Sequence, residues 1–157
     1  MLMVRGVLYM GSWEQAVLEL LQENGCKPWR EGELICASLR GQGGEYDLYL
    51  LVKQQMLVSV ARWPKEVPDE RQMEMAHFLH LANFGLLLGC FELDFDQGDL
   101  RYRCCLYQPG PPPLKEALRR YLFTPALMLE RYAPGIQAVL EKGCLARRAL
   151  ALCEGEE

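Results

Sequence analysis

The chain has 157 residues, of which half are apolar and 24% are charged, and its formal net charge is −4. This length suits one globular domain with one core, and the composition is typical of neither a disordered nor a membrane-spanning chain. Nucleic-acid binding is not expected, because a binder needs a concentrated basic surface and the arginine doublets at 119–120 and 147–148 are isolated.

The ends and the cysteines indicate where the protein resides. The first ten residues are too short for a secretory signal, and no apolar run approaches the roughly 18 residues of a membrane-spanning helix. We therefore expect a cytoplasmic protein that does not contact membranes. The seven cysteines lack C-x-x-C spacing and are odd in number, which argues against a zinc knuckle or a disulfide framework. Cys36, Cys90 and Cys104 are expected at inward strand positions as small apolar residues.

The first half of the chain predicts a helix followed by a three-stranded sheet. Ser12 and Gln15 form a capping box that opens the helix, and Asn24–Gly25 ends it. Three antiparallel strands are predicted at 34–39, 46–52 and 56–63. The glycine-rich segment 41–44 precedes a strand, whereas a phosphate-binding loop would precede a helix, so we interpret it as a mobile hairpin loop.

A second helix and a hairpin are predicted next. Pro64 and Pro68 end the first sheet region, and the helix is expected from Asp69 to about Leu86. Alternating apolar and charged residues then predict a hairpin that turns at Gln97–Gly98. If the turn has two residues, the expected cross-strand pairs are Asp94–Arg101, Glu92–Arg103, Phe95–Leu100 and Leu93–Tyr102.

Helical sequence resumes after the proline-rich segment 109–113, with interruptions predicted at Thr124–Pro125 and Pro134–Gly135. The fold class expected is therefore α+β, in the order α-β-β-β-α-β-β-α, with an antiparallel sheet and helices mainly on one face. The domain division expected is an N-terminal extension at 1–11, a single domain at 12–142, and a C-terminal helical extension with a frayed acidic tail at 143–157.

Several short segments, taken with the element order, match the pattern of one protein family. They are Pro64…Pro68-x-x-Arg71, Leu81-Ala82-Asn83, Leu88-Gly89-Cys90-Phe91-Glu92-Leu93-Asp94, Gly98-Asp99-Leu100-Arg101-Tyr102-Arg103 and Glu130-Arg131-Tyr132-x-Pro134. The chain thereby resembles the YbjN-like family of bacterial proteins over nearly its whole length. The resemblance implies a fold like that of type III secretion chaperones, which are small, acidic, commonly dimeric proteins that hold an extended client segment. It also implies a regulatory role in sensory transduction, and it supplies no catalytic residue.

The second predicted helix carries apolar stripes on opposite sides. The stripe expected to cover the sheet consists of Met75, Phe78, Leu79, Ala82 and Leu86. The opposite stripe consists of Met73, His77, His80 and Phe84. Because a helix on one sheet buries a single stripe, the second predicts the seam of a symmetric homodimer, or else a face that the last helix of the chain covers. A metal site at His77, His80 and Glu74 would lack a fourth ligand and is not expected.

The three-stranded region predicts a second interaction surface. A turn at Gln54–Gln55 would place an apolar patch on the face opposite the core, made of Tyr49, Leu51, Val58 and Val60. Asp47, Arg62 and Lys53 border it. Such a patch suits an extended client segment or a second subunit, unless a helix of the chain covers it.

The sequence offers little for catalysis, because its two histidines share one helix and no serine or cysteine lies in a nucleophile motif. Glu92 and Asp94 are expected to be neutralised by nearby arginines. We therefore expect no catalytic residue, cofactor or metal. The function expected is a chaperone-like or regulatory module that binds a protein client or signalling partner. The alternative is a redox or small-ligand sensor that uses its cysteines, with Cys105 as the reactive one.

Overall fold

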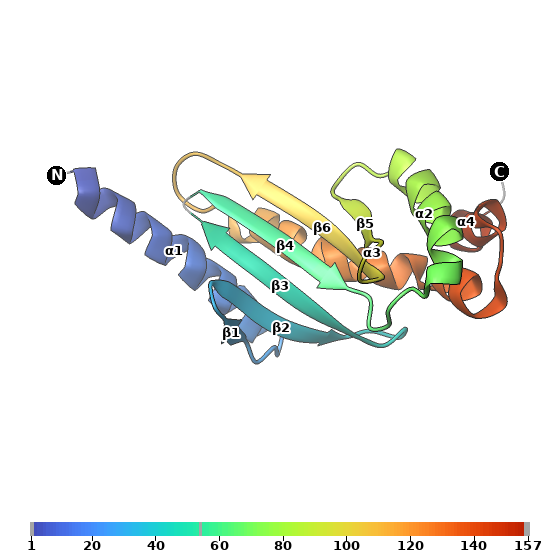
Figure 1. Cartoon of the computed structure of the whole chain (residues 1–157). Helices are drawn as coiled ribbons and strands as arrows, with labels where there is room; N and C mark the ends of the chain where they lie inside the picture. Colours follow the sequence, from blue (N-terminus) through green and yellow to red (C-terminus); the bar gives the residue numbers. More distant parts are fainter. Residues whose placement is uncertain (1, 54, 156–157) are drawn as a thin grey trace.

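The computed structural model describes residues 2–53 and 55–155, with side-chain surroundings from residue 13 onward. These residues form one six-stranded antiparallel sheet and four helices (Figure 1). In chain order the elements are α1 (Leu2–Glu23), β1 (Trp29–Glu31), β2 (Leu34–Arg40), β3 (Glu45–Lys53), β4 (Met56–Arg62), α2 (Asp69–Phe84), β5 (Cys90–Asp94), β6 (Asp99–Tyr107), α3 (Lys115–Lys142) and α4 (Ala146–Glu154). The α+β class is confirmed, and β1 and a separate α4 are additions to the predicted order.

The strands lie in the order β1-β2-β3-β4-β6-β5. The predicted register between β3 and β4 is confirmed, since Leu51 faces Val58 and Asp47 faces Arg62. Gln55 in the connecting turn has a φ of 65°, which a non-glycine residue seldom adopts outside a tight turn. This register fixes which side chains of the two central strands share a face.

Two clusters of buried side chains fill the same face of the sheet. Below β2 to β4, α1 and the first half of α3 contribute Trp13, Val17, Leu20, Leu118 and Leu122. Toward β6 and β5, α2, α4 and the second half of α3 contribute Met75, Phe78, Leu129, Tyr132, Ile136 and Ala149. Figure 1 shows α3 running behind the sheet across both regions. The face that carries Leu48, Leu50 and Leu57 is therefore the core face.

Helix α1 is longer than predicted. It begins at Leu2, so Ser12 lies inside the helix and the capping-box prediction is wrong. The residues before Ser12 include leucine, methionine and valine and no proline, so nothing in them forces the helix to stop there. The predicted end is confirmed, because the helix finishes at Glu23, directly before Asn24 and Gly25.

Helix α3 passes through both of its prolines. It is continuous from Lys115 to Lys142, and the predicted interruptions at Pro125 and Pro134 are wrong. Packing against the sheet supports it, and the buried Ser59 hydroxyl donates to the Leu122 carbonyl at 2.8 Å, in the turn before Pro125. The helical sequence is instead divided at Gly143, which ends α3 with a φ of 61°.

Helix α4 comprises residues 146–154 of the predicted C-terminal extension and contacts both α2 and α3. Its own residue at the N-cap position, Leu145, provides no side-chain cap. The Glu74 carboxylate of α2 accepts a hydrogen bond from the Ala146 backbone N–H instead. The last two residues of the predicted acidic tail, 156 and 157, lie outside the described residues.

The β5–β6 hairpin is present, but its strands pair two residues away from the predicted register. Leu93 faces Leu100 and Glu92 faces Arg101, because residues 95–98 form a four-residue turn instead of the two-residue turn expected. A shift of two residues keeps every side chain on its own face, so alternation alone does not reveal it. The turn docks on the segment before α2, where Val67 N–H donates to the Gly98 carbonyl at 2.8 Å.

Candidate functional site

The four predicted patch residues share the face of the sheet turned away from the helices. Tyr49, Leu51, Val58 and Val60 are half-buried and line one shallow hollow of about 500 Å³. This outer face is turned toward the viewer in Figure 1, with α3 on the far side of the sheet. In the described part of the chain no helix covers the patch, contrary to the alternative that a helix would bury it.

Charged side chains form one border of this hollow, and most are paired. Arg62 donates to Asp99 at 2.8 Å. Arg101 and Arg103 both donate to Glu92, at 2.7 and 2.8 Å, which leaves the predicted Asp94–Arg101 pair unformed. The remaining acidic residues that line the hollow are Glu66 and Asp94. The rim therefore presents both signs of charge beside an apolar surface.

The cysteines divide between the two faces differently from the prediction. Cys104 lies on the core face and is 1% exposed, and burial raises its pKa to about 12. Cys36 faces Tyr49 and Cys90 faces Arg103, so both lie on the outer face and the inward placement predicted for them is wrong, although Cys36 is fully buried there. The reason is that the odd-numbered residues of β2 and β5, such as Ile35 and Phe91, supply the core. Cys105, next to Cys104, is exposed on the outer face.

On α2, the stripe expected to cover the sheet is buried at Met75, Phe78, Leu79 and Ala82. All four residues of the opposite stripe are exposed, with Met73 at 76% and Phe84 at 93%. The alternative that the last helix covers this second stripe is therefore wrong, because α4 packs elsewhere on α2. None of Met73, His77, His80 and Phe84 lines the hollow on the sheet, so the two predicted surfaces are separate.

The polar residues weighed for chemistry have structural partners. Glu74, which stood beside His77 and His80 in the metal hypothesis, holds the start of α4. Glu92 is bound by two arginines. Among the residues that the structure describes, no three His, Cys, Asp or Glu side chains are grouped so that they could hold a metal ion.

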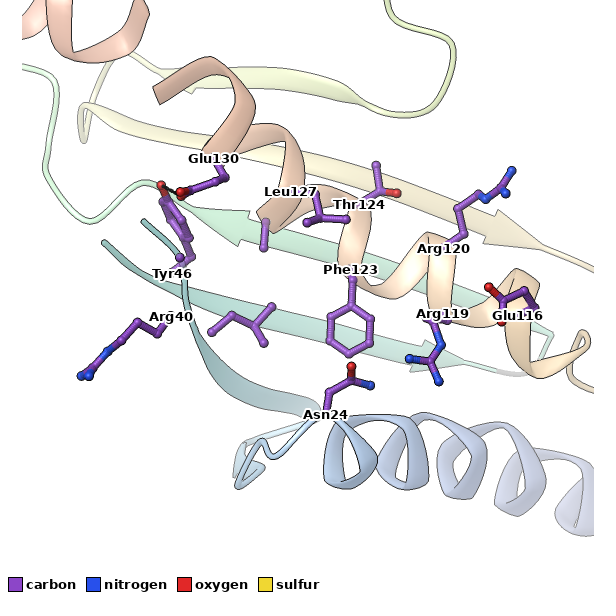
Figure 2. Close-up of a pocket in the computed structure, with 13 residues that line it drawn as sticks. Asn24, Arg40, Tyr46, Glu116, Arg119, Arg120, Phe123, Thr124, Leu127 and Glu130 are labelled. Atoms are coloured by element: carbon purple, nitrogen blue, oxygen red, sulfur yellow. Dashed lines mark hydrogen bonds between the residues drawn. The ribbon is translucent and has the colours of Figure 1, made fainter. Parts of the chain in front are cut away.

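The sequence did not predict a second cavity, which lies between the end of α1, β2 and α3 (Figure 2). Its volume is about 530 Å³. The apolar lining consists of Leu39, Phe123, Ala126 and Leu127, and the polar lining includes Asn24, Arg40, Tyr46, Glu116, Arg119, Arg120, Thr124 and Glu130. Phe123 lies near the middle of the view in Figure 2, with Arg119 and Asn24 on one side and the Glu130–Tyr46 pair on another.

Glu130 fastens the glycine-rich loop to α3 at the edge of this cavity. Its carboxylate accepts hydrogen bonds from Gly43 N–H and from the Tyr46 hydroxyl, both at 2.8 Å. Burial, and then the carboxylate of Glu130, raise the pKa of Tyr46. A Cβ on Gly41 would lie 2.5 Å from Glu130 Oε2, so a glycine permits this close approach. The predicted hairpin loop is confirmed, since β2 and β3 flank the segment, and the hydrogen bond to Glu130 ties Gly43 to α3.

No local sequence pattern predicts the hydrogen bond between Gly43 and Glu130, because the two residues are 87 positions apart in the chain.

Within the described residues, no helix is long and apolar enough to cross a bilayer. Comparison of the chain with protein-family models, with curated proteins and with solved structures found no match in any of the three.

Proposed function

We propose that this chain is a non-enzymatic, chaperone-like or regulatory module that binds a protein client on the outer face of its sheet, in the cytoplasm and without a cofactor. The observation that carries the proposal is the patch of Tyr49, Leu51, Val58 and Val60, which no helix covers among the described residues. Apolar side chains on such a surface gain about 25 cal/mol for each Å² that a partner removes from water. The resemblance to the YbjN-like family and to type III secretion chaperones suggests the same class of activity.

The shape of the hollow favours an extended segment as the occupant. Its lining crosses β2, β3, β4 and β6, from Leu34 to Arg103, and reaches Asp94 at the end of β5. At a strand spacing of about 4.8 Å, the first four of these strands span roughly 14 Å, which four or five extended residues would cross. The mixed charges at one border would orient such a segment, since each sign repels a misplaced like charge.

Substitution at the centre of the patch tests client binding. Replacing Tyr49 with a photo-crosslinking phenylalanine derivative should capture the client, and Val60→Asp should weaken its binding at least about tenfold by placing a charge in the contact. Leu152→Asp on α4 is the matched control, because Leu152 is exposed far from the patch in the fold. Equal client binding by both aspartate variants would refute the proposal.

We further propose that the exposed α2 stripe is the seam of a homodimer. Met73 and Phe84 present large apolar side chains, and His77 and His80 lie on the same side of the helix. Phe84→Asp or His77→Asp would bury a charge in such a seam and should give monomers in sedimentation. A wild-type monomer, or dimers that both variants leave unchanged, would exclude this seam.

A cysteine-based sensor is the second candidate. Cys105 is exposed on the client-binding face, and its sulfur lies 3.7 Å from Arg103 Nη1. A sensor requires that dilute peroxide convert Cys105 to a sulfenic acid and thereby change client binding. Client binding that is the same before and after peroxide, with Cys105 oxidised, would remove this candidate.

A further inference from the structure

We propose that the cavity between α1, β2 and α3 is a second binding site, which takes a small carboxylate with an apolar chain. Arg119 would hold the carboxylate, and the apolar lining would hold the chain. The site is separate from the outer face of the sheet, so this inference does not depend on the client-binding proposal.

The cavity has the size and surface of a small-molecule site. Its volume of about 530 Å³ falls in the range of roughly 300–1,000 Å³ typical of ligand pockets. Leu39 from β2 and Phe123, Ala126 and Leu127 from α3 form the apolar part of the lining. Figure 2 shows the Phe123 and Leu127 side chains in the middle of the site. Leu127 is 65% exposed and would gain burial from an occupant.

Arg119 lacks a full set of acceptors. Its Nε is buried and has no hydrogen-bond partner in the described structure. Its Nη2 forms an ion pair with Glu23 Oε2 at 3.7 Å, which is longer than a hydrogen bond, and Lys115 shares the same carboxylate. A buried donor without a partner costs about 1–3 kcal/mol. Because the Arg119 side chain is 38% exposed, a ligand carboxylate would bind the accessible end of the guanidinium, and a turn of this group toward the cavity would bring Nε to the same carboxylate.

The other charged groups limit the ligand to a single negative charge. Glu130 accepts hydrogen bonds from Gly43 and Tyr46 and forms no ion pair with Arg119 in the described structure, where Arg119 is paired with Glu23. Arg40 and Arg120, which point outward in Figure 2, form no ion pair in the described part of the chain and add positive potential at the rim. The carboxylates of Glu116 and Glu130 would repel a second negative charge.

Calorimetric titration with octanoate tests the site. We expect saturable one-to-one binding with a dissociation constant of about 1 mM or tighter, and weaker binding of neutral octanol. Arg119→Met, which keeps the apolar stem, should weaken octanoate binding at least about tenfold. Leu127→Glu, at an exposed position, should weaken octanoate binding to a similar extent by repulsion. This variant tests the site if Arg119→Met does not fold. Arg147→Met on α4 is the matched control and should bind as wild type does.

Amide chemical shifts locate the bound octanoate. Shifts at Gly41, Gly43 and Thr124 would support the site. The proposal is overturned if octanoate does not saturate, if octanol binds equally well, if Leu127→Glu binds like wild type, or if the shifts fall only around Tyr49 and Val58 on the outer face. Loss of client binding in Val60→Asp with octanoate binding retained would show that the two sites are independent.

Discussion

The two faces of the central strands carry similar apolar side chains, but helices cover only one of the two faces. On β3 and β4, Leu48, Leu50 and Leu57 are fully buried under the helices. Their neighbours Leu51 and Val58, which are similarly apolar, are half-buried on the open side. Apolar residues on both faces therefore do not predict which face is covered, and in the described part of the chain the helices cover only one of them.

Two adjacent cysteines give the largest expected contrast between the faces. At pH 8, a thiol with a pKa of about 12 is ionised in roughly one molecule in ten thousand, and Cys104 is also inaccessible. Its reaction with a disulfide reagent should be at least about 1,000-fold slower than that of Cys105. Comparing the Cys104→Ala and Cys105→Ser variants separates the two rates. Similar rates in the folded protein would contradict the assignment of faces.

Matched leucine truncations compare the faces by stability. Leu57→Ala should lower the free energy of unfolding by about 2–5 kcal/mol, because the buried site cannot collapse fully. Leu51→Ala on the outer face leaves no enclosed cavity and should cost less than about 1 kcal/mol. Urea unfolding measures both, and equal losses would show that the outer face is covered.

Glu130→Gln tests the anchor between α3 and the glycine-rich loop. Loss of the charged acceptor should lower the free energy of unfolding by about 1–2 kcal/mol, since two hydrogen bonds weaken. It should also speed hydrogen exchange at Gly43. Glu116→Gln is the control, because Glu116 is exposed on the same helix and forms no ion pair in the described structure. Unchanged exchange at Gly43 would argue against the anchor.

The smallest effect is expected at the outer rim. Glu92→Gln weakens the pairs with Arg101 and Arg103, but both guanidinium groups reach solvent, so the loss should be below about 1 kcal/mol and should shrink in high salt. Thermal unfolding at two salt concentrations measures it. A larger loss that salt does not reduce would show that the rim is buried by another subunit.

The two hairpins show how far the sequence predicts the fold. Alternation placed the paired side chains on the correct faces in both, since it has a period of two residues. The predicted Phe95–Leu100 pair is wrong, because Phe95 lies in the turn and is 50% exposed. The β3–β4 register was predicted correctly because Gln55 lies in the tight turn expected there. The β5–β6 register was not, because the longer turn depends on the docking of Gly98 against Val67, a contact from another part of the chain. Helix α3 likewise continues through Pro125 because of packing that local propensity does not contain.

The surfaces were predictable to different degrees. The outer patch and the exposed α2 stripe follow from periodicity, and the structure places each set on one uncovered face. The cavity of Figure 2 brings together three segments distant in the sequence, and Arg119 has no pattern that sets it apart from its neighbour Arg120. What distinguishes Arg119 is its buried Nε, which has no hydrogen-bond partner in the described structure, and this feature depends on the fold and not on the local sequence.

The capping of α4 by Glu74 has a consequence for the order of folding. A helix of nine residues is too short to be stable alone in water, and the first backbone N–H of α4 donates to the Glu74 carboxylate of α2. The C-terminal turn-and-helix should therefore assemble only after α2 is in place, and it should be among the first segments to open. The amide hydrogens of α4 would then exchange with solvent before those of the central strands. Their exchange rate would show whether α2 is folded in place.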